Sequence, residues 1–179
     1  VAHGVSDNIP ARLGQPVTKT YVPADAVAGY APPEQAGIDH DAQAAKALLA
    51  EAGYPEGEGL EGLSILYNTG SGHEDIAQAI ARIWQQTLGV TVTLEGVEVK
   101  TFSDRLKSHD YTIARASWFG DYRDPTTWLE KMRTGDGNND CGYSNPEYDA
   151  LLDRAAATLD QDQRFAILRD AEALLLRDA

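Results

Sequence analysis

The residues best able to take part in chemistry lie between Arg115 and Asp124, where an apolar run ends in a charged turn. Residues 111–118 favour a β-strand, carry Arg115 in their middle, and are followed by Gly120 and Asp121. An arginine in a covered strand must reach the sheet edge or bind an anion, because such strands are otherwise apolar. In open α/β sheets, ligands bind beyond the carboxyl ends of strands. The pattern therefore predicts a ligand site around Arg115 and Asp121.

Each of these charged residues also has a purely structural interpretation. Arg115 can form an internal ion pair with one of the many carboxylates of the chain. Asp121 follows a glycine, so its side chain can hydrogen-bond its own turn backbone. The residues alone leave these alternatives open.

A second group of polar residues follows the strand predicted for residues 63–68. Tyr67 and Asn68 stand at its carboxyl end, where a side-chain amide can bond an extended peptide backbone or form a turn. His73 begins the next helix, either as an exposed first-turn residue or as part of an anion site, which a helix N-terminus favours. No second histidine stands at metal-ligand spacing, so we expect no metal at His73.

A partial calcium-loop pattern lies further along the chain. Asp136, Asn138, Asp140 and Glu147 occupy the first, third, fifth and twelfth places of such a loop. The sixth place, which needs glycine for its sharp turn, is Cys141. We therefore expect neither a metal nor another cofactor.

Hydrophobic periodicity and capping residues predict the elements that position these side chains. Strands are expected at residues 63–68, 90–95 and 111–118, and helices at residues 41–52, 73–88, 100–108, 124–132, 146–158 and 162–177. The helix at 73–88 has one apolar stripe that includes Trp84, which we expect in the core. The first three strands and their connecting helices form a βαβαβ unit. The fold class is therefore α/β, with a mainly parallel sheet flanked by helices and a helical C-terminal tail.

Length and charge limit the classes of partner. The 179 residues suffice for one domain, and we expect an irregular Pro/Gly-rich lead-in at residues 1–39 and one α/β lobe at residues 40–179. A net charge of −13 argues against nucleic acid and anionic membranes as partners. One cysteine excludes an internal disulfide framework. The chain starts at Val1 and stops inside a helical pattern, so we expect an excised fragment whose leader or anchor lies elsewhere.

Several segments, in the same order, resemble the oligopeptide-binding proteins of ABC importers, which belong to family 5 of the extracellular solute-binding proteins. The matching segments are Tyr67–His73, Ile83–Val90, Ala116–Trp128, Asn138–Asn139 and Tyr143–Asp149. The resemblance covers nearly the whole chain and implies one periplasmic-binding-protein type II-like lobe. Because such proteins are several hundred residues long, the chain is expected to be a C-terminal fragment of one.

The resemblance also implies roles for the charged residues. In the family pattern Trp-x-x-Asp, matched by Trp118 and Asp121, the aspartate accepts the α-ammonium group of a peptide. The arginine at the place of Arg115 meets the terminal carboxylate. A histidine at the place of His73 contributes to the carboxylate end of longer peptides. The central expectation is that Asp121 lies at a water-excluded rim, where a charge-assisted bond to an ammonium group is strong.

The remaining candidate ligand-binding residues would contact the peptide backbone or its side chains. Asn68 and Tyr67 are expected to bond the backbone, and Trp118 and Phe119 to line a side-chain pocket. Family members often have tryptophan at the place of Val99 and a small residue at that of Phe119, so the pockets of this chain are expected to differ.

The function implied is a substrate-binding component, not an enzyme. It would capture oligopeptides by their charged termini and backbone for import. The expected partners are a peptide and, through the full-length parent, the ABC permease subunits, with no nucleic acid. We expect a monomer at a periplasmic or extracellular, cell-envelope location. The alternatives are another ligand of the same superfamily (dipeptide, nickel, haem or sugar), a hydrolase that uses Asp121 or Asp124 with His73, or a pure interaction domain.

Overall fold

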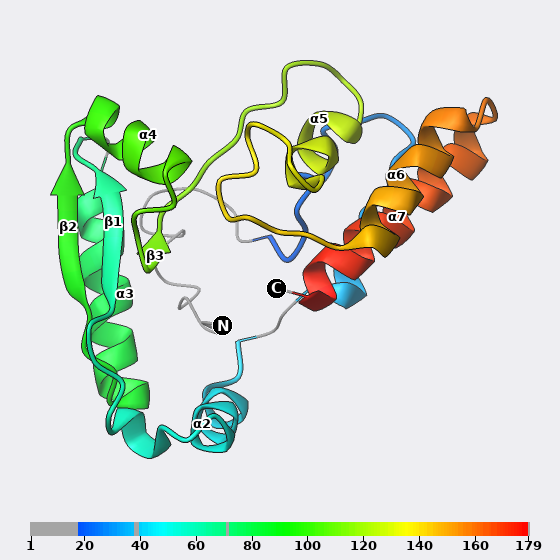
Figure 1. Cartoon of the computed structure of the whole chain (residues 1–179). Coiled ribbons are helices and arrows are strands. Elements are labelled where there is room, and N and C mark those ends of the chain that lie inside the picture. The colour runs from blue at the N-terminus through cyan, green and yellow to red at the C-terminus, as the bar shows by residue number, and fades with distance from the viewer. Residues whose placement is uncertain (1–17, 38–39, 71, 179) are drawn as a thin grey trace. The chain divides into compact units, whose positions relative to one another are not determined.

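The computed structural model describes residues 18–37, 40–70 and 72–178. These residues form two compact units, coloured by residue number in Figure 1. The sheet unit contains the described residues from 40 to 116, and the helical unit contains residues 18–37 and 117–178. The single boundary expected at residue 39 stays a prediction. No helix within the described ranges is long and apolar enough to cross a membrane.

The sheet unit contains a three-stranded parallel sheet of order β2-β1-β3 (Figure 1). Its strands are β1 (Ser64–Asn68), β2 (Thr93–Val97) and β3 (Ile113–Ala114). Ile65 lies opposite Leu94 on one side and Ile113 on the other, and both pairings are parallel. The predicted βαβαβ unit with a parallel sheet is confirmed. The carboxyl ends of β1 and β3 therefore lie at the same edge of the sheet.

Three helices accompany the sheet, namely α2 (Ala42–Glu51), α3 (His73–Leu88) and α4 (Val99–Lys107), and a short 3-10 turn, η2, covers Pro55–Gly57. The Asp41 side chain accepts hydrogen bonds from the backbone N–H groups of Gln43 and Ala44, so it is the N-cap of α2. Gly89 ends α3 in the left-handed conformation, at a φ of 70°, as glycine does at many helix ends.

The core of the sheet unit lies between the sheet and α3. Its buried members are Ile65, Tyr67, Ala77, Trp84 and Val90. The predicted core position of Trp84 is confirmed. Tyr67 packs so closely on Gly96 that a Cβ atom there would lie 2.7 Å from the tyrosine hydroxyl, so the ring occupies space that only a glycine leaves.

Two strands differ from their predicted bounds. The strand expected at 90–95 begins at Thr93, because Val90 instead completes the end of α3. Its backbone N–H donates to the Trp84 carbonyl oxygen and its side chain is buried. The strand expected at 111–118 is reduced to Ile113–Ala114. Arg115 adds one more bond, from its N–H to the Leu66 carbonyl oxygen at 2.9 Å.

The helical unit contains α5 (Thr126–Leu129), the 3-10 turn η3 (Glu130–Met132), α6 (Pro146–Ala157) and α7 (Gln161–Asp178). Helices α6 and α7 lie side by side (Figure 1). The Asn145 side chain caps α6 by accepting from the backbone N–H groups of Glu147 and Tyr148, and Pro146 occupies the first turn. The predicted helical tail is confirmed.

Residues 18–37 contribute three side chains to the core of the helical unit. They contain one short 3-10 turn, η1 (Glu34–Ala36), and are otherwise irregular, as expected. Most of the segment is exposed or half-buried, but Val22, Val27 and Tyr30 are buried in one cluster with residues of α7 and its neighbours. Sequence periodicity gives no sign of this packing, since an irregular segment has no repeating apolar face.

A buried carboxylate in α7 bonds this segment. Glu172 is 0% exposed. Its Oε1 accepts from the backbone N–H groups of Tyr21 and Val22, both at 2.8 Å, and its Oε2 accepts from the Tyr30 hydroxyl at 2.6 Å. Burial raises the pKa of Glu172, although the three hydrogen bonds act in the opposite direction. The carboxylate therefore supplies the acceptors that the irregular backbone lacks.

Candidate functional site

In the sheet unit, the structure brings Arg115 and Asn68 together. The Arg115 Nη1 donates to the Asn68 Oδ1 at 3.1 Å. Asn68 is the last residue of β1 and Arg115 follows β3, so both lie at the carboxyl edge of the sheet. Burial lowers the pKa of Arg115, yet a guanidinium group stays protonated at any physiological pH. Arg115 was expected either to form an internal ion pair or to bind an anion. The structure shows one partner of its guanidinium group, the neutral side-chain amide of Asn68.

His73 begins α3, close to the same edge. Burial lowers the pKa of its imidazole, and the positive charge of Arg115 lowers it further. The neutral imidazole therefore predominates at pH 7, and His73 offers a hydrogen bond rather than a second positive charge.

This coupling gives a test of the sheet-unit geometry. We expect the His73 side chain to titrate below pH 6.5, the ordinary value, and Arg115→Met to raise its midpoint by removing the neighbouring charge. The measurement is an NMR titration of the histidine ring protons, with His73→Gln for assignment. Arg82→Met, at an exposed position on the same helix, serves as the control and should leave the midpoint unchanged. An identical midpoint with and without Arg115 would contradict the arrangement.

In the helical unit, Trp118 lies in a fixed position at the start of the loop that leads to α5. Its indole Nε1 donates to the Thr127 carbonyl oxygen at 2.7 Å. The Lys131 ammonium lies 5.4 Å from the centroid of the Trp118 ring, within the range of a cation–π contact. The neighbouring Phe119 is 85% exposed. Phe119 is thus available to a ligand and contributes little to the core.

Asp121 is exposed, and its backbone is fixed by the protein. Its N–H donates to the Thr127 Oγ1 at 2.9 Å. Among the described residues, no hydrogen bond or ion pair involves its carboxylate. The water-excluded position expected from the sequence is not found in this chain by itself. The carboxylate is instead an exposed anion, without a partner in the part of the chain that the structure describes, on a loop whose backbone bonds Thr127.

Asp124 has a structural role. Its carboxylate forms a two-pronged ion pair with Arg164 of α7, at 2.7 and 2.8 Å, and also accepts from the Thr126 hydroxyl and backbone N–H. Burial alone would raise the pKa of Asp124, but the bonds from Arg164 and Thr126 lower it overall. The helix expected at residues 124–132 begins at Thr126, with Pro125 at the N-cap position, and the Asp124 side chain accepts from the Thr126 backbone N–H just before it. Asp124 is therefore occupied by Arg164 and Thr126.

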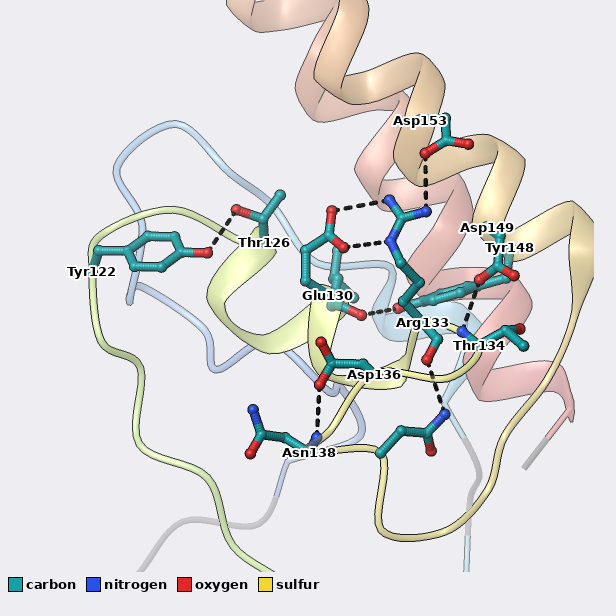
Figure 2. A network of polar contacts seen from close by, with 12 residues as sticks. Tyr122, Thr126, Glu130, Arg133, Thr134, Asp136, Asn138, Tyr148, Asp149 and Asp153 are labelled. Carbon is teal, nitrogen blue, oxygen red and sulfur yellow. Dashed lines mark hydrogen bonds and ion pairs between the residues drawn. The ribbon is translucent and has the colours of Figure 1, made fainter.

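Ion pairs and hydrogen bonds between polar side chains stabilise the loop after η3. Figure 2 shows Arg133 between Glu130 and Asp153, and the Asp136 carboxylate accepting from the Asn138 backbone. The two ion pairs of Arg133 are 2.7 and 2.9 Å long, and the bond to Asp136 is 2.8 Å long. Asp140 is another residue of the partial calcium pattern, and its Oδ2 lies 3.3 Å from the Lys131 Nζ. Within the described ranges, no group of three or more side chains has the placement of a metal site.

The comparisons with known proteins agree with this fold. Residues 7–140 match the family of bacterial extracellular solute-binding proteins, family 5 Middle, and the chain therefore belongs to that family. Its members are substrate-binding proteins. The chain is 37% identical over 143 residues to the oligopeptide-binding protein OppA of Bacillus subtilis (strain 168), a match that covers 77% of this chain and 26% of that protein. It is 39% identical over 135 residues to the periplasmic oligopeptide-binding protein OppA of Salmonella typhimurium, covering 75% and 25%.

A solved structure shows the same likeness in three dimensions. The structure of Haemophilus influenzae OppA in complex with the peptide RPPGFSPFR superimposes with a TM-score of 0.81 at 32% identity, over 97% of this chain and 36% of that one. The fold is thus of the periplasmic-binding-protein type II kind. The chain spans about a quarter of the length of the two curated relatives.

Sequence reasoning missed Thr127 and Lys131, although both contact predicted site residues. Thr127 is 5% exposed and stands in an otherwise apolar turn, Thr127-Trp128-Leu129, in which all three side chains are buried. A polar residue in a buried turn needs a hydrogen-bond partner, and that was the available signal. Lys131 gave no such signal, because a lysine in a sequence is ordinarily expected to be exposed, whereas this side chain is only 10% exposed.

Proposed function

We propose that this chain is part of the substrate-binding component of an ABC importer and binds oligopeptides by their charged ends and backbone. The family membership and the similarity to proteins named for oligopeptide binding support this class of ligand. The observation that carries the assignment is Asp121, an anion without a protein partner among the described residues, on a loop whose backbone is fixed by Thr127. An exposed carboxylate on a hydrogen-bonded backbone suits a cationic group of a ligand.

Asp121 would accept hydrogen bonds from the α-ammonium group of the peptide. Such a bond is strong when water is excluded, and Asp121 in this chain is exposed. We expect the exclusion of water to come from the peptide itself and from regions that the relatives have beyond the matched quarter of their length, closing over the ligand.

The carboxylate end of the peptide would meet Arg115, with Asn68 and His73 as neutral hydrogen-bonding groups. Arg115 supplies the positive charge, because the lowered pKa of His73 leaves its imidazole neutral at pH 7. Asn68, already bonded to Arg115, would keep the guanidinium oriented or exchange that bond for one to the peptide. Tyr67 stays a predicted backbone contact, although its side chain is mostly buried on Gly96.

The side chains of the peptide would lie against Trp118 and Phe119. Phe119, at 85% exposure, presents an apolar ring that a ligand can cover.

The finer assignments belong to the same proposal. We propose a monomeric protein that is not an enzyme, binds no nucleic acid and lies in the periplasm or outside the cell. It would deliver peptides to ABC permease subunits. The names of the two curated relatives support the peptide ligand, and the name of the Salmonella protein supports the periplasmic location.

The test is calorimetric titration of the whole protein with matched peptides that have a free or an acetylated amino terminus. We expect Asp121→Asn to weaken binding of the free peptide by about 2 kcal/mol, because it removes the charge that faces the ammonium group. The acetylated peptide should bind weakly to both proteins. Asp170→Asn, on an exposed face of α7, is the matched control and should change neither affinity. Equal binding of free and acetylated peptides by the unaltered protein would contradict the proposal.

A further inference from the structure

One residue, Thr127, bonds both members of the Trp-x-x-Asp pattern. Its carbonyl oxygen accepts from the indole of Trp118 at 2.7 Å, and its hydroxyl oxygen accepts from the backbone N–H of Asp121 at 2.9 Å. Trp118 precedes Thr127 by nine positions and Asp121 precedes it by six. The two ends of the loop between Trp118 and Asp121 are thus attached to the same residue.

Thr127 is itself in a rigid place. It is 5% exposed in the first turn of α5, where Pro125 precedes it and the buried Trp128 and Leu129 follow. A threonine has a branched Cβ, which restricts its χ1 rotation, and burial restricts it further. The hydroxyl therefore has a nearly fixed direction relative to the helix.

The loop also passes very close to this turn. A Cβ atom at Gly120 would lie 2.6 Å from the Trp128 ring and 3.0 Å from the Thr127 methyl group, so the position accepts only glycine without a shift of its neighbours. Close contact on one side and two hydrogen bonds to Thr127 leave the backbone at Asp121 little freedom. These contacts fix the backbone from which the Asp121 side chain extends.

We propose that Thr127 is a positioning residue for recognition of the peptide amino terminus, and that it acts by fixing Asp121 relative to Trp118. This inference rests on the proposed function. Thr127 contacts no ligand in this account, since its side chain is buried. Its effect is to keep the Asp121 carboxylate where the ammonium group arrives, so that the loop does not have to become ordered on binding.

Two substitutions separate the hydroxyl from the rest of the side chain. Thr127→Val preserves the branched shape and removes the acceptor for the Asp121 N–H. Thr127→Ser preserves the acceptor and removes the methyl group. A role that depends only on packing predicts that serine is the more harmful change, whereas positioning through the hydroxyl predicts that valine is.

The measurement is the ratio of affinities for free and acetylated peptides, determined with the whole protein. We expect Thr127→Val to reduce this ratio about ten-fold, the effect of one lost hydrogen bond, and Thr127→Ser to leave it within about two-fold. Thermal unfolding establishes that each variant is folded. Should Thr127→Val fail to fold, Thr127→Ala, which also lacks the hydroxyl and adds no bulk, carries the same expectation.

The outcomes distinguish this inference from the proposed function. If the unaltered protein prefers free peptides and Thr127→Val or Thr127→Ala retains that preference in full, the positioning role is wrong and the proposed function stands. If Thr127→Ser loses as much preference as Thr127→Val, the hydrogen bond of the hydroxyl does not account for the effect, and the inference is again overturned. If the unaltered protein shows no preference, the proposed function fails first.

Discussion

Replacement of Glu172 with alanine should lower the free energy of unfolding of the helical unit by about 4 kcal/mol, because it leaves buried donors without an acceptor. The Tyr21 and Val22 N–H groups and the Tyr30 hydroxyl all donate to this one carboxylate. Water cannot replace it readily, since Glu172 and Val22 are both 0% exposed. Residues 18–37 should therefore lose their attachment to α7.

The effect is measured by denaturant unfolding, followed by the fluorescence of the tryptophans in the helical unit. Tyr30→Phe removes one of the three bonds and should cost about 1 kcal/mol. Asp170→Ala alters an exposed acid of the same helix and should change stability by less than about 0.5 kcal/mol. A loss for Glu172→Ala no larger than that of Asp170→Ala would show that the carboxylate does not anchor the segment.

The Asp124–Arg164 pair should give the second largest effect. We expect Asp124→Ala to destabilise the helical unit by about 3 kcal/mol, because Arg164 and the Thr126 N–H each lose their acceptor. Both charged side chains are less than one-third exposed, and their contact is two-pronged, the stronger geometry for such pairs. The pKa of Asp124 is lowered in the folded state. The contribution is therefore present above the unfolded pKa and is lost as the pH falls through the folded one.

A double-mutant cycle isolates this pair. Asp124→Ala combined with Arg164→Met should show a coupling of about 1.5 kcal/mol at neutral pH that disappears in acid. The Arg133–Asp153 pair is a matched comparison in the same unit, because it has one bond and its aspartate is 72% exposed. Its coupling should be below about 0.5 kcal/mol. Equal coupling in the two pairs would argue against an anchoring role for Asp124.

Local signals predicted the helices well. The Asp41 cap of α2, the left-handed Gly89 after α3 and the Asn145-Pro146 start of α6 each depend on residues within one turn of the helix end. These bonds form between sequence neighbours, so a reader of the sequence can identify them. The parallel sheet followed from the alternation of strands and helices for the same reason.

Contacts between distant residues were harder to predict. The attachment of residues 18–37 to Glu172 joins positions about 150 residues apart, through backbone N–H groups that every sequence has. Likewise, β3 is short because few of its residues pair with β1, and its apolar composition did not indicate where the pairing ends. Tertiary packing decided both outcomes.

In the candidate site, too, the predicted features depend on local sequence and the missed ones on contacts between residues further apart in the chain. Asn68 was predicted at the carboxyl end of its strand, whereas Arg115 was predicted in the middle of the strand at 111–118. Because β3 ends at Ala114, Arg115 follows its carboxyl end and meets Asn68 at the same edge. Thr127 was missed because its bonds go to the indole of Trp118 and the backbone of Asp121, a pairing that depends on the path of the loop.

The most direct test of the central claim is a crystal structure of the whole protein with a bound oligopeptide. The account predicts that the α-amino nitrogen of the peptide lies within hydrogen-bonding distance, about 3 Å, of the Asp121 carboxylate, with water excluded from the contact. A peptide whose amino terminus pairs with a different acid, or remains in solvent while Asp121 is still exposed, would contradict it.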